Sequence, residues 1–364
     1  MKIRIFSLSL ITLFLLVVVV QANMGIERDA DAVEATEVFE FGPTWGSSGI
    51  VFFGGTSPLQ SNAQLNLFRV GSSGENREQI TNATGRDWQP WFSPDGSRIY
   101  FSSDRGGNSE IYLADANGGN VQQITRNGGV NRTPYPSPDG RYLAFASDLE
   151  LTGNLDLFIM DLQTNQLVQI TTDPGMDQLP TWNPNGVHLV FVSNRDGNEN
   201  LYLVDFSAGI ERFSVSQLTD NEGVDTRPNW YDAKHLVWES DRTGNLELFS
   251  ARFDNNELGT PNNVTQSSAD EFGRPAFSPD RSQMAFTSNR NGSNQIFILD
   301  LLLPFADAID ENNNNQLDDD EVLNAIQLWI EGRSPFRLNQ PISDDMIRQL
   351  VDLWVKRLPT DTVL

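Results

Sequence analysis

One short pattern recurs six times along this chain of 364 residues, and the repetition limits its possible folds more than any other feature. The clearer copies contain a turn of the Ser-Pro-Asp-Gly type. In chain order the copies are TWGSSGIVFFGG at 44–55, FSPDGSRIYFSSDR at 92–105, PSPDGRYLAFASDL at 136–149, NPNGVHLVFVSNR at 183–195, NWYDAKHLVWESDR at 229–242 and FSPDRSQMAFTSNR at 277–290. A proline precedes each copy, at intervals of 44 to 48 residues: Pro43, Pro90, Pro134, Pro180, Pro228 and Pro275.

Each copy predicts four short strands. In the second copy, an apolar strand at Trp91-Phe92 precedes the turn, in which proline fixes φ and glycine allows a positive φ. Ile99-Tyr100-Phe101, Ile111-Tyr112 and Gln123-Ile124-Thr125 then predict three further strands. Four antiparallel strands in a unit of this length form one blade of a β-propeller, and blades bury each other's faces around an axis. We therefore predict an all-β fold, a six-bladed β-propeller over residues 37–301.

The ends of the repeated region predict how the ring closes. The sixth copy ends after its third strand, at Ile296 to Leu301, and no Ile-Thr strand follows it. Upstream of the first proline, residues 37–41 alternate as a strand does. We predict that 37–41 supplies the missing outer strand of the last blade, which would leave no open edge.

These repeats resemble the WD-like repeats of the TolB-like propeller family, whose hallmark is a Ser-Pro-Asp-Gly turn, a Phe-containing strand and an Asp/Asn-Arg-Gly turn. The resemblance covers nearly three quarters of the chain. The first copy departs from it, because Gly54-Gly55 stand where the Asp-Arg pair is expected. The resemblance implies a protein that acts through contacts with other proteins.

A ring of polar residues is the candidate ligand site of the propeller. Three or four positions before the prolines stand Asp87, Asn131, Asp177, Asp225 and Glu271. Propeller geometry brings such positions together around one mouth of the channel, where they would bind a peptide, glycan or cation. The alternative is structural, with the same residues capping strands and tying blades together.

The C-terminal region predicts a separate calcium module at 310–358. An EF-hand-type loop needs oxygen ligands at positions 1, 3, 5, 7, 9 and 12. The residues at those positions are Asp310, Asn312, Asn314, Gln316, Asp318 and Glu321. Asn315 replaces the usual glycine of the loop, and asparagine tolerates the left-handed conformation. A disordered Asn/Asp-rich linker is the alternative.

Two helices are expected in this small α-helical module, and they repeat one another. Leu328-Trp329-Ile330 in the first matches Leu353-Trp354-Val355 in the second at an offset of 25 residues. A duplicated loop-helix unit resembles a dockerin, a module that binds cohesins on partner scaffolds. Pro335 and Arg337 stand among the ligand positions of the second half, so we predict one calcium ion and leave a cohesin-like partner in doubt.

Composition excludes several classes of protein. The chain has no cysteine, which excludes disulfides and Cys-ligated metal. Its formal net charge of -24 argues against nucleic acid and anionic membranes as partners, because both repel an acidic protein. We expect a monomer.

The N-terminus is typical of an export signal. Lys2 and Arg4 precede an apolar run from Ile5 to Val20, and Val20-Gln21-Ala22 offers a cleavage site. We predict a signal peptide at 1–22, linkers at 23–36 and 302–309, and a secreted protein, extracellular or periplasmic, with no membrane span after cleavage. An uncleaved anchor is the alternative.

Two functions follow from these features. The first is a secreted, non-enzymatic binding or scaffold protein whose propeller recognises a protein or polysaccharide. The alternative is a polysaccharide-active enzyme, a hydrolase or lyase, that uses the channel mouth. No Gly-x-Ser-x-Gly elbow supports a serine hydrolase.

Overall fold

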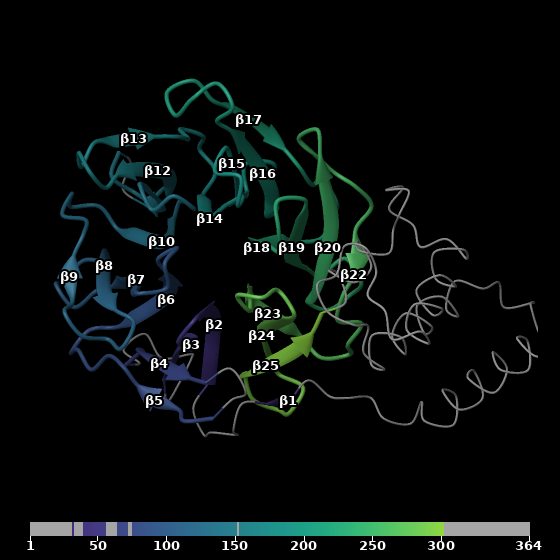
Figure 1. Cartoon of the computed structure of the whole chain (residues 1–364). Coiled ribbons are helices and arrows are strands. Elements are labelled where there is room, and N and C mark those ends of the chain that lie inside the picture. Colours follow the sequence, from purple (N-terminus) through teal and green to yellow (C-terminus); the bar gives the residue numbers. More distant parts are fainter. Residues whose placement is uncertain (1–30, 33–38, 56–63, 72–74, 151–152, 302–364) are drawn as a thin grey trace, which may run out of the picture. The chain divides into compact units, whose positions relative to one another are not determined.

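The described residues form six antiparallel sheets arranged in a ring (Figure 1), which confirms the predicted all-β, six-bladed propeller. The structure is a computed structural model, and it describes residues 31–32, 39–55, 64–71, 75–150 and 153–301. The compact unit that contains the propeller is Ala32–Leu299. The predicted signal peptide, the linker 302–309 and the calcium module with all six of its predicted ligands lie outside the described residues.

The strands of each blade are counted outward from the axis, and they are consecutive along the chain in every blade except the sixth. The first, innermost strands are β2 (Phe39–Gly46), β6 (Asp87–Phe92), β10 (Asn131–Pro136), β14 (Asp177–Trp182), β18 (Asp225–Trp230) and β23 (Glu271–Phe277). The second strands are β3 (Gly49–Gly55), β7 (Arg98–Ser103), β11 (Tyr142–Ser147), β15 (His188–Ser193), β19 (His235–Ser240) and β24 (Gln283–Ser288). The third strands are β4 (Asn66–Val70), β8 (Glu110–Asp115), β12 (Asp156–Asp161), β16 (Asn200–Asp205), β20 (Glu247–Asp254) and β25 (Gln295–Asp300). The outer strands are β5 (Glu78–Gln79), β9 (Gln122–Gln123), β13 (Leu167–Gln169), β17 (Ser214–Gln217), the pair β21 (Glu257–Leu258) and β22 (Asn262–Asn263), and β1 (Asp31–Ala32).

The ring closes through an earlier segment than the sequence predicted. The sixth sheet has the order β1-β25-β24-β23, so Asp31–Ala32, inside the predicted linker 23–36, supplies its outer strand. The prediction that 37–41 does so is wrong: within that segment, Phe39 and Phe41 belong to β2 and face Gly55 and Phe53 of the first blade. The strand continues through Pro43 because an innermost strand has no partner on its axial side, and a proline is tolerated there.

Every innermost strand contains a bulge beside its proline. The register with the second strand shifts there in all six sheets, as between Trp88 and Trp91 in β6. The bulge carries a residue with positive φ, and these residues are Gly42, Gln89, Thr133, Leu179, Arg227 and Gly273. Bulges bend a strand and redirect its side chains. The bend turns the residues that follow each proline toward the axis or the neighbouring blade.

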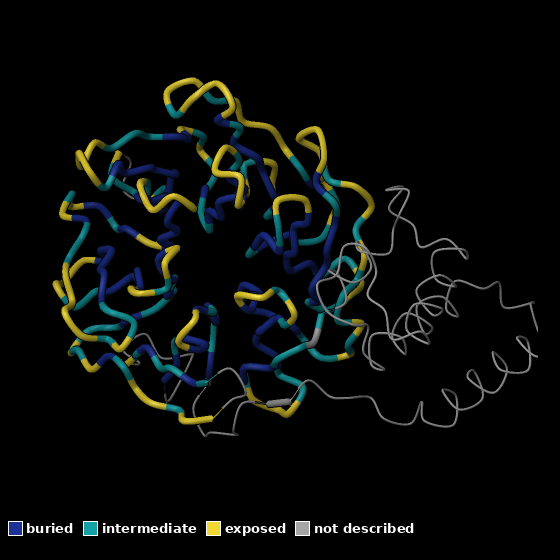
Figure 2. Tube along the Cα trace, in the orientation of Figure 1, coloured by how far each residue is buried: buried dark blue, intermediate teal, exposed yellow. Residues whose placement is uncertain are grey.

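The core lies inside and between the blades, and the turns are exposed (Figure 2). One aromatic side chain in each second strand is completely buried. These six residues are Phe52, Phe101, Phe145, Phe191, Trp238 and Phe286. Each aromatic ring buried in this way removes a large apolar area from water, so the repeat supplies one anchor per blade.

Candidate functional site

The five predicted ring residues stand at the beginning of innermost strands and are fully buried. Asp87 shows the pattern for its blade. Its Oδ1 accepts hydrogen bonds from Arg105 Nη2 at 2.7 Å and from Ser103 Oγ at 2.6 Å. The register brings these groups together, because Asp87 faces Ser103 across the sheet.

The same carboxylate–arginine pair, which we call the clamp, recurs in three other blades. The distances from arginine Nη2 to the carboxylate are 2.8 Å for Arg195–Asp177, 2.8 Å for Arg242–Asp225 and 2.8 Å for Arg290–Glu271. A carboxylate without access to water needs such a partner, since an unpaired buried charge costs several kcal/mol. The recurring Asp/Asn-Arg sequence therefore serves the buried acid of its own blade.

Each clamp arginine also covers an aromatic pair. In the fourth blade, Arg195 Cζ lies 5.6 Å from the ring centroid of Phe191 and 4.7 Å from that of Tyr202. Equivalent contacts are made by Arg105, Arg242 and Arg290. A guanidinium within about 6 Å of a ring centroid is attracted by the ring's quadrupole. The clamp thus joins the first, second and third strands of a blade.

The first blade has a clamp that the sequence analysis missed. Glu40 stands at the equivalent position of β2 and is fully buried, although Gly54-Gly55 replace the usual Asp-Arg pair. Arg77, far along the blade near β5, forms an ion pair with Glu40 at 3.2 Å. Its Cζ lies 5.5 Å from the Phe52 centroid and 4.7 Å from that of Phe68. The sequence contained the acid at its usual place before Pro43, but no local signal for its partner.

The third blade has no clamp. Asn131 takes the place of the acid and Leu149 that of the arginine. Asn131 Nδ2 donates to Glu110 Oε2 of the second blade at 2.7 Å. Burial raises the pKa of Glu110, an effect that hydrogen bonds from Thr125 and Asn131 oppose. This blade is therefore joined to its neighbour by an amide in place of an internal ion pair.

These contacts favour the structural alternative for the five ring residues. Each is closed off from solvent and bonded to a neighbouring side chain. Binding of a ligand by Asp87, Asn131, Asp177, Asp225 or Glu271 stays a prediction.

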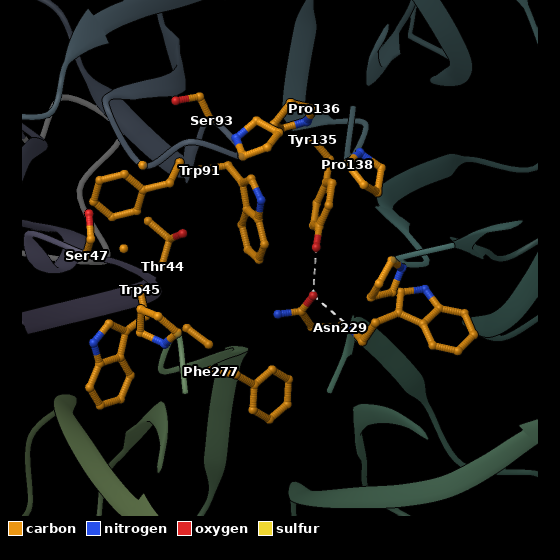
Figure 3. A pocket seen from close by; sticks show the side chains of 18 of the residues that line it. Thr44, Trp45, Ser47, Trp91, Ser93, Tyr135, Pro136, Pro138, Asn229 and Phe277 are labelled. Atoms are coloured by element: carbon orange, nitrogen blue, oxygen red, sulfur yellow. Dashed lines mark hydrogen bonds between the residues drawn. The ribbon is translucent and has the colours of Figure 1, made fainter. Parts of the chain in front are cut away.

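A cavity of about 460 Å³ lies at the opposite ends of the innermost strands, where the Ser-Pro-Asp-Gly turns begin (Figure 3). We call it the turn-end cavity. Its lining comes from all six blades. Seven aromatic residues contribute to the lining: Trp45, Trp91, Phe92, Tyr135, Trp182, Trp230 and Phe277.

Trp91 and Tyr135 form one wall, where they project side by side toward the middle of the cavity (Figure 3). Their ring centroids are 4.2 Å apart. Tyr135 is buried, whereas Trp91 and Trp45 are half-buried and keep part of their indole surface accessible. A cavity with accessible aromatic faces is typical of ligand sites.

Asn229 lies at the hydroxyl end of Tyr135 and connects the blades across the axis (Figure 3). Its Oδ1 accepts hydrogen bonds from Tyr135 Oη at 2.9 Å and Thr181 Oγ1 at 3.2 Å. Its Nδ2 donates to the carbonyl of Pro275 at 2.8 Å. The position is therefore held by blades three, four and six, so the polar side of the cavity is rigid.

Two charged residues are found among the described residues that line the cavity, Asp95 and Arg281. Hydrogen bonds from Ser93 and Ser97 lower the pKa of Asp95 to about 2. Asp95 is consequently ionised at neutral pH and cannot serve as a general acid. The sequence predicted these segments only as turns between strands and did not indicate that they surround a cavity.

Together, the closed ring of six sheets and the turn-end cavity define a β-propeller with a concave, aromatic binding surface at one end of its axis. A sequence profile of the TolB beta propeller domain matches residues 30–150 and 129–215, together just over half of the chain. The chain belongs to this TolB β-propeller domain family. A TolB homolog of Chlorobium luteolum is 31% identical over 93 residues, which span 26% of this chain and 20% of that protein.

Solved structures show the same fold. TolB from Acinetobacter baumannii superposes with a TM-score of 0.57 at 24% identity, covering 78% of this chain and 64% of that protein. A putative TolB from Agrobacterium tumefaciens gives 0.54 at 18% identity, over 74% and 92% of the two chains. A gluconolactonase from Xanthomonas campestris gives 0.55 at 12% identity, over 74% and 88%.

Two features are absent from the described part of the chain. No helix in this part of the chain is long and apolar enough to cross a membrane. Among the same residues, no three His, Cys, Asp or Glu side chains gather in a way that could hold a metal ion.

Proposed function

We propose that the chain is a secreted, non-enzymatic binding protein whose propeller recognises a protein or polysaccharide ligand in the turn-end cavity. The observation that carries this proposal is the accessible aromatic surface of Trp45 and Trp91 beside a rigid polar wall. Ligand pockets combine apolar faces for affinity with a few fixed polar groups for orientation. Membership of the TolB β-propeller family supports a binding role.

The chemistry of the lining supports binding over hydrolysis. Glycoside hydrolysis uses two carboxyl groups, one of which must hold a proton at working pH. Asp95 is the single carboxylic acid among the described lining residues, and its lowered pKa keeps it ionised. The acids of the clamps are buried at the other ends of the strands.

A pair of tryptophans on one strand provides the experiment. Trp91 lines the cavity, whereas Trp88 lies three residues earlier on β6, half-buried, with Arg86 Cζ 5.4 Å from its ring centroid. The immobilised wild-type chain would be exposed to conditioned culture medium and to a panel of glycans and peptides. We expect Trp91→Ala to lower the affinity for every retained ligand at least about tenfold, and Trp88→Ala to leave it within about twofold.

Equal losses in the two variants would contradict a site at the turn-end cavity. Thermal unfolding of both variants provides the control, since each removes one half-buried indole. Turnover of any panel glycan, followed as new reducing ends or unsaturated products, would refute the non-enzymatic proposal.

We also propose that the loop 310–321 holds one calcium ion. The six candidate ligands offer only oxygen, which is the donor that calcium prefers. Calorimetric titration should give one site per chain, and Glu321→Gln should weaken it because the final glutamate of such a loop supplies two oxygens. Two equivalent sites, or none, would contradict this proposal.

The remaining expectations on partners are proposals of the same kind. We propose a monomer that binds no nucleic acid, with a cohesin-like protein as one candidate partner of the C-terminal module. Light scattering tests whether the chain is a monomer. Retention on a cohesin column, with and without a chelator, tests the cohesin-like partner.

A further inference from the structure

The sixth blade departs from the repeat at one position of its turn. Gly96, Gly140 and Gly186 end the equivalent turns with φ of 69°, 70° and 76°. Arg281 stands there in the sixth blade with φ of 63°. Its N–H donates to the carbonyl of Ser278 at 2.9 Å, the same bond that the glycines make. The turn of the sixth blade has the same geometry as the others, although arginine disfavours a positive φ.

Such a residue needs an explanation. A bulky side chain at positive φ is strained, and strained residues cluster at binding sites. The side-chain contacts of Arg281 are weak: Nη1 lies 3.4 Å from the carbonyl of Trp230, and Cζ lies 5.8 Å from the Phe277 centroid. Its main-chain carbonyl accepts a hydrogen bond from Tyr231 Oη at 3.1 Å. Arg281 is also the single basic residue among the described residues that line the turn-end cavity.

A second arginine makes this part of the molecule electropositive. Arg274 is buried against the aromatic wall, with Cζ 5.4 Å from the Trp91 centroid and 5.5 Å from that of Tyr135. Its Nη2 has no hydrogen-bond partner within the described part of the chain. Burial lowers the pKa of Arg274 to about 10, so the group stays charged at neutral pH.

Among the described lining residues, the one acid that opposes these two arginines is Asp95, and Asp280 beside Arg281 in the same turn adds a second, exposed carboxylate. Asp95 lies on the rim and is exposed, where water and salt screen its field. The nearby Arg227 and Glu239 neutralise one another through a 2.7 Å ion pair. The cavity therefore favours an anionic group, although the whole chain carries a net charge of -24.

The rim distinguishes between a sugar and a peptide. Its exposed corners are Pro94, Pro138, Pro184 and Pro279. Proline has no N–H, so these corners cannot donate the main-chain hydrogen bonds on which the recognition of extended peptides relies. A pyranose ring needs none of these, because its C–H face packs on an indole and its hydroxyl groups bond to side chains.

We propose that the turn-end cavity binds a carboxylated sugar, a hexuronic acid residue, with its ring against Trp91 and its carboxylate on Arg281. This inference rests on the proposed function and specifies the ligand. Guanidinium binds a carboxylate through parallel, charge-assisted hydrogen bonds. The strain at Arg281 is then the cost of placing a cation beside the sugar, the single one among the described lining residues.

Calorimetry with matched trisaccharides tests the proposal. The probes are trimers of galacturonate and of glucuronate, each beside the neutral hexose trimer of the same linkage. We expect the wild-type chain to prefer an acidic trimer at least about tenfold, and Arg281→Gly to remove that preference. The preference should also shrink as salt concentration rises. Arg281→Gly restores the residue of the other turns, so its thermal midpoint should stay the same or rise.

Arg141→Gln provides the matched control. Arg141 follows the turn of the third blade and is not in the cavity lining; its side chain is exposed, and it pairs with the largely covered Asp161. The variant removes one positive charge from the same end of the propeller, and the acidic-trimer affinity should change less than about twofold. A similar loss in Arg141→Gln and Arg281→Gly would overturn the proposal, because it would indicate a general field effect.

The remaining outcomes separate this inference from the proposed function. If acidic and neutral trimers bind equally and Trp91→Ala weakens both, the inference fails and the binding function stands. The same holds if a capped acidic peptide binds through Trp91 and no uronate does. If no glycan or peptide binds in a way that depends on Trp91, both fail.

Discussion

The six innermost strands begin alike and end differently. At their start, five blades bury a carboxylate against an arginine that covers an aromatic pair, as Asp177 does with Arg195. At their end, the residues after the prolines vary from Trp91 and Tyr135 to Asn229 and Ala276, and a cavity lies between them. Both ends are polar in part, and the turn-end cavity lies at the end that follows the prolines.

Recurrence and divergence have different causes within this repeat protein. A group that every blade needs for its own folding recurs, and its bonds are satisfied inside the blade. Side chains that meet at the axis need not be the same in every blade, because residues from six blades together line one cavity. The divergent end is therefore the better place to look for function in this chain.

The largest expected effect comes from breaking one clamp. Asp177→Ala leaves the mostly covered Arg195 with Ser193 and a 4.0 Å contact to Asp173, and should lower the free energy of unfolding by about 3 kcal/mol. Asp95→Ala at the other end of the propeller removes exposed hydrogen bonds and should cost about 1 kcal/mol. Urea denaturation of both variants measures the difference. Equal costs would mean that the two ends are not distinct in the way described.

Building a clamp in the third blade sharpens the same comparison. Asn131→Asp alone places a carboxylate beside Glu110 and should cost about 2 kcal/mol. Adding Leu149→Arg should recover at least about 1 kcal/mol of that loss through the new pair. A double-mutant cycle by urea denaturation gives the coupling. A coupling near zero would show that the clamp depends on more than its acid and its arginine.

Exchanging glycine and arginine at the last turn position tests the strain at Arg281. Each substitution should change the free energy of unfolding by about 1 kcal/mol, in opposite directions. Gly186 has open space around its would-be Cβ, so Gly186→Arg adds backbone strain without a clash and should be destabilising. Arg281→Gly should be stabilising by a similar or smaller amount. Thermal unfolding compares both with the wild type, and a destabilised Arg281→Gly would mean that Arg281 supports the fold.

The smallest effect concerns the pH dependence of the third blade's junction. The folded state raises the pKa of Glu110 above its ordinary value of 4.5. Its contribution to stability is therefore complete below that value and is lost as pH rises through the raised pKa. Glu110→Gln should be as stable as the wild type in acid and should become more stable than the wild type as pH approaches neutral. Thermal midpoints of both proteins across this pH range provide the test. A difference between them that narrowed as pH rose would refute the raised pKa of Glu110.

Much of the fold could be predicted, because each blade repeats the same signals. Proline and glycine in the turns, and one buried aromatic per second strand, recur often enough to give six sheets. The closing strand was misplaced since Asp31–Ala32 has only two residues and no pattern. Phe39 and Phe41 alternate convincingly but belong to β2, where a bulge lets the strand continue through Pro43.

The site could be predicted less well, for a different reason. The sequence predicts Asp87 and its equivalents as a polar ring. It does not show that an arginine from a later turn of the same blade covers each acid. The pairing of Glu40 with Arg77 joins opposite ends of a blade and leaves no local trace. Trp91 was assigned to a strand, whereas its orientation toward the axis depends on the bulge before Pro90.

Hydrogen exchange with and without the tightest-binding panel ligand would locate the binding site on the propeller. We expect protection on binding in the segments 91–96 and 276–281, at the turn-end cavity, and none in the clamp turns 104–108 and 194–198. Protection confined to the clamp turns would contradict the account, since it would place the ligand at the end where the carboxylates are already paired.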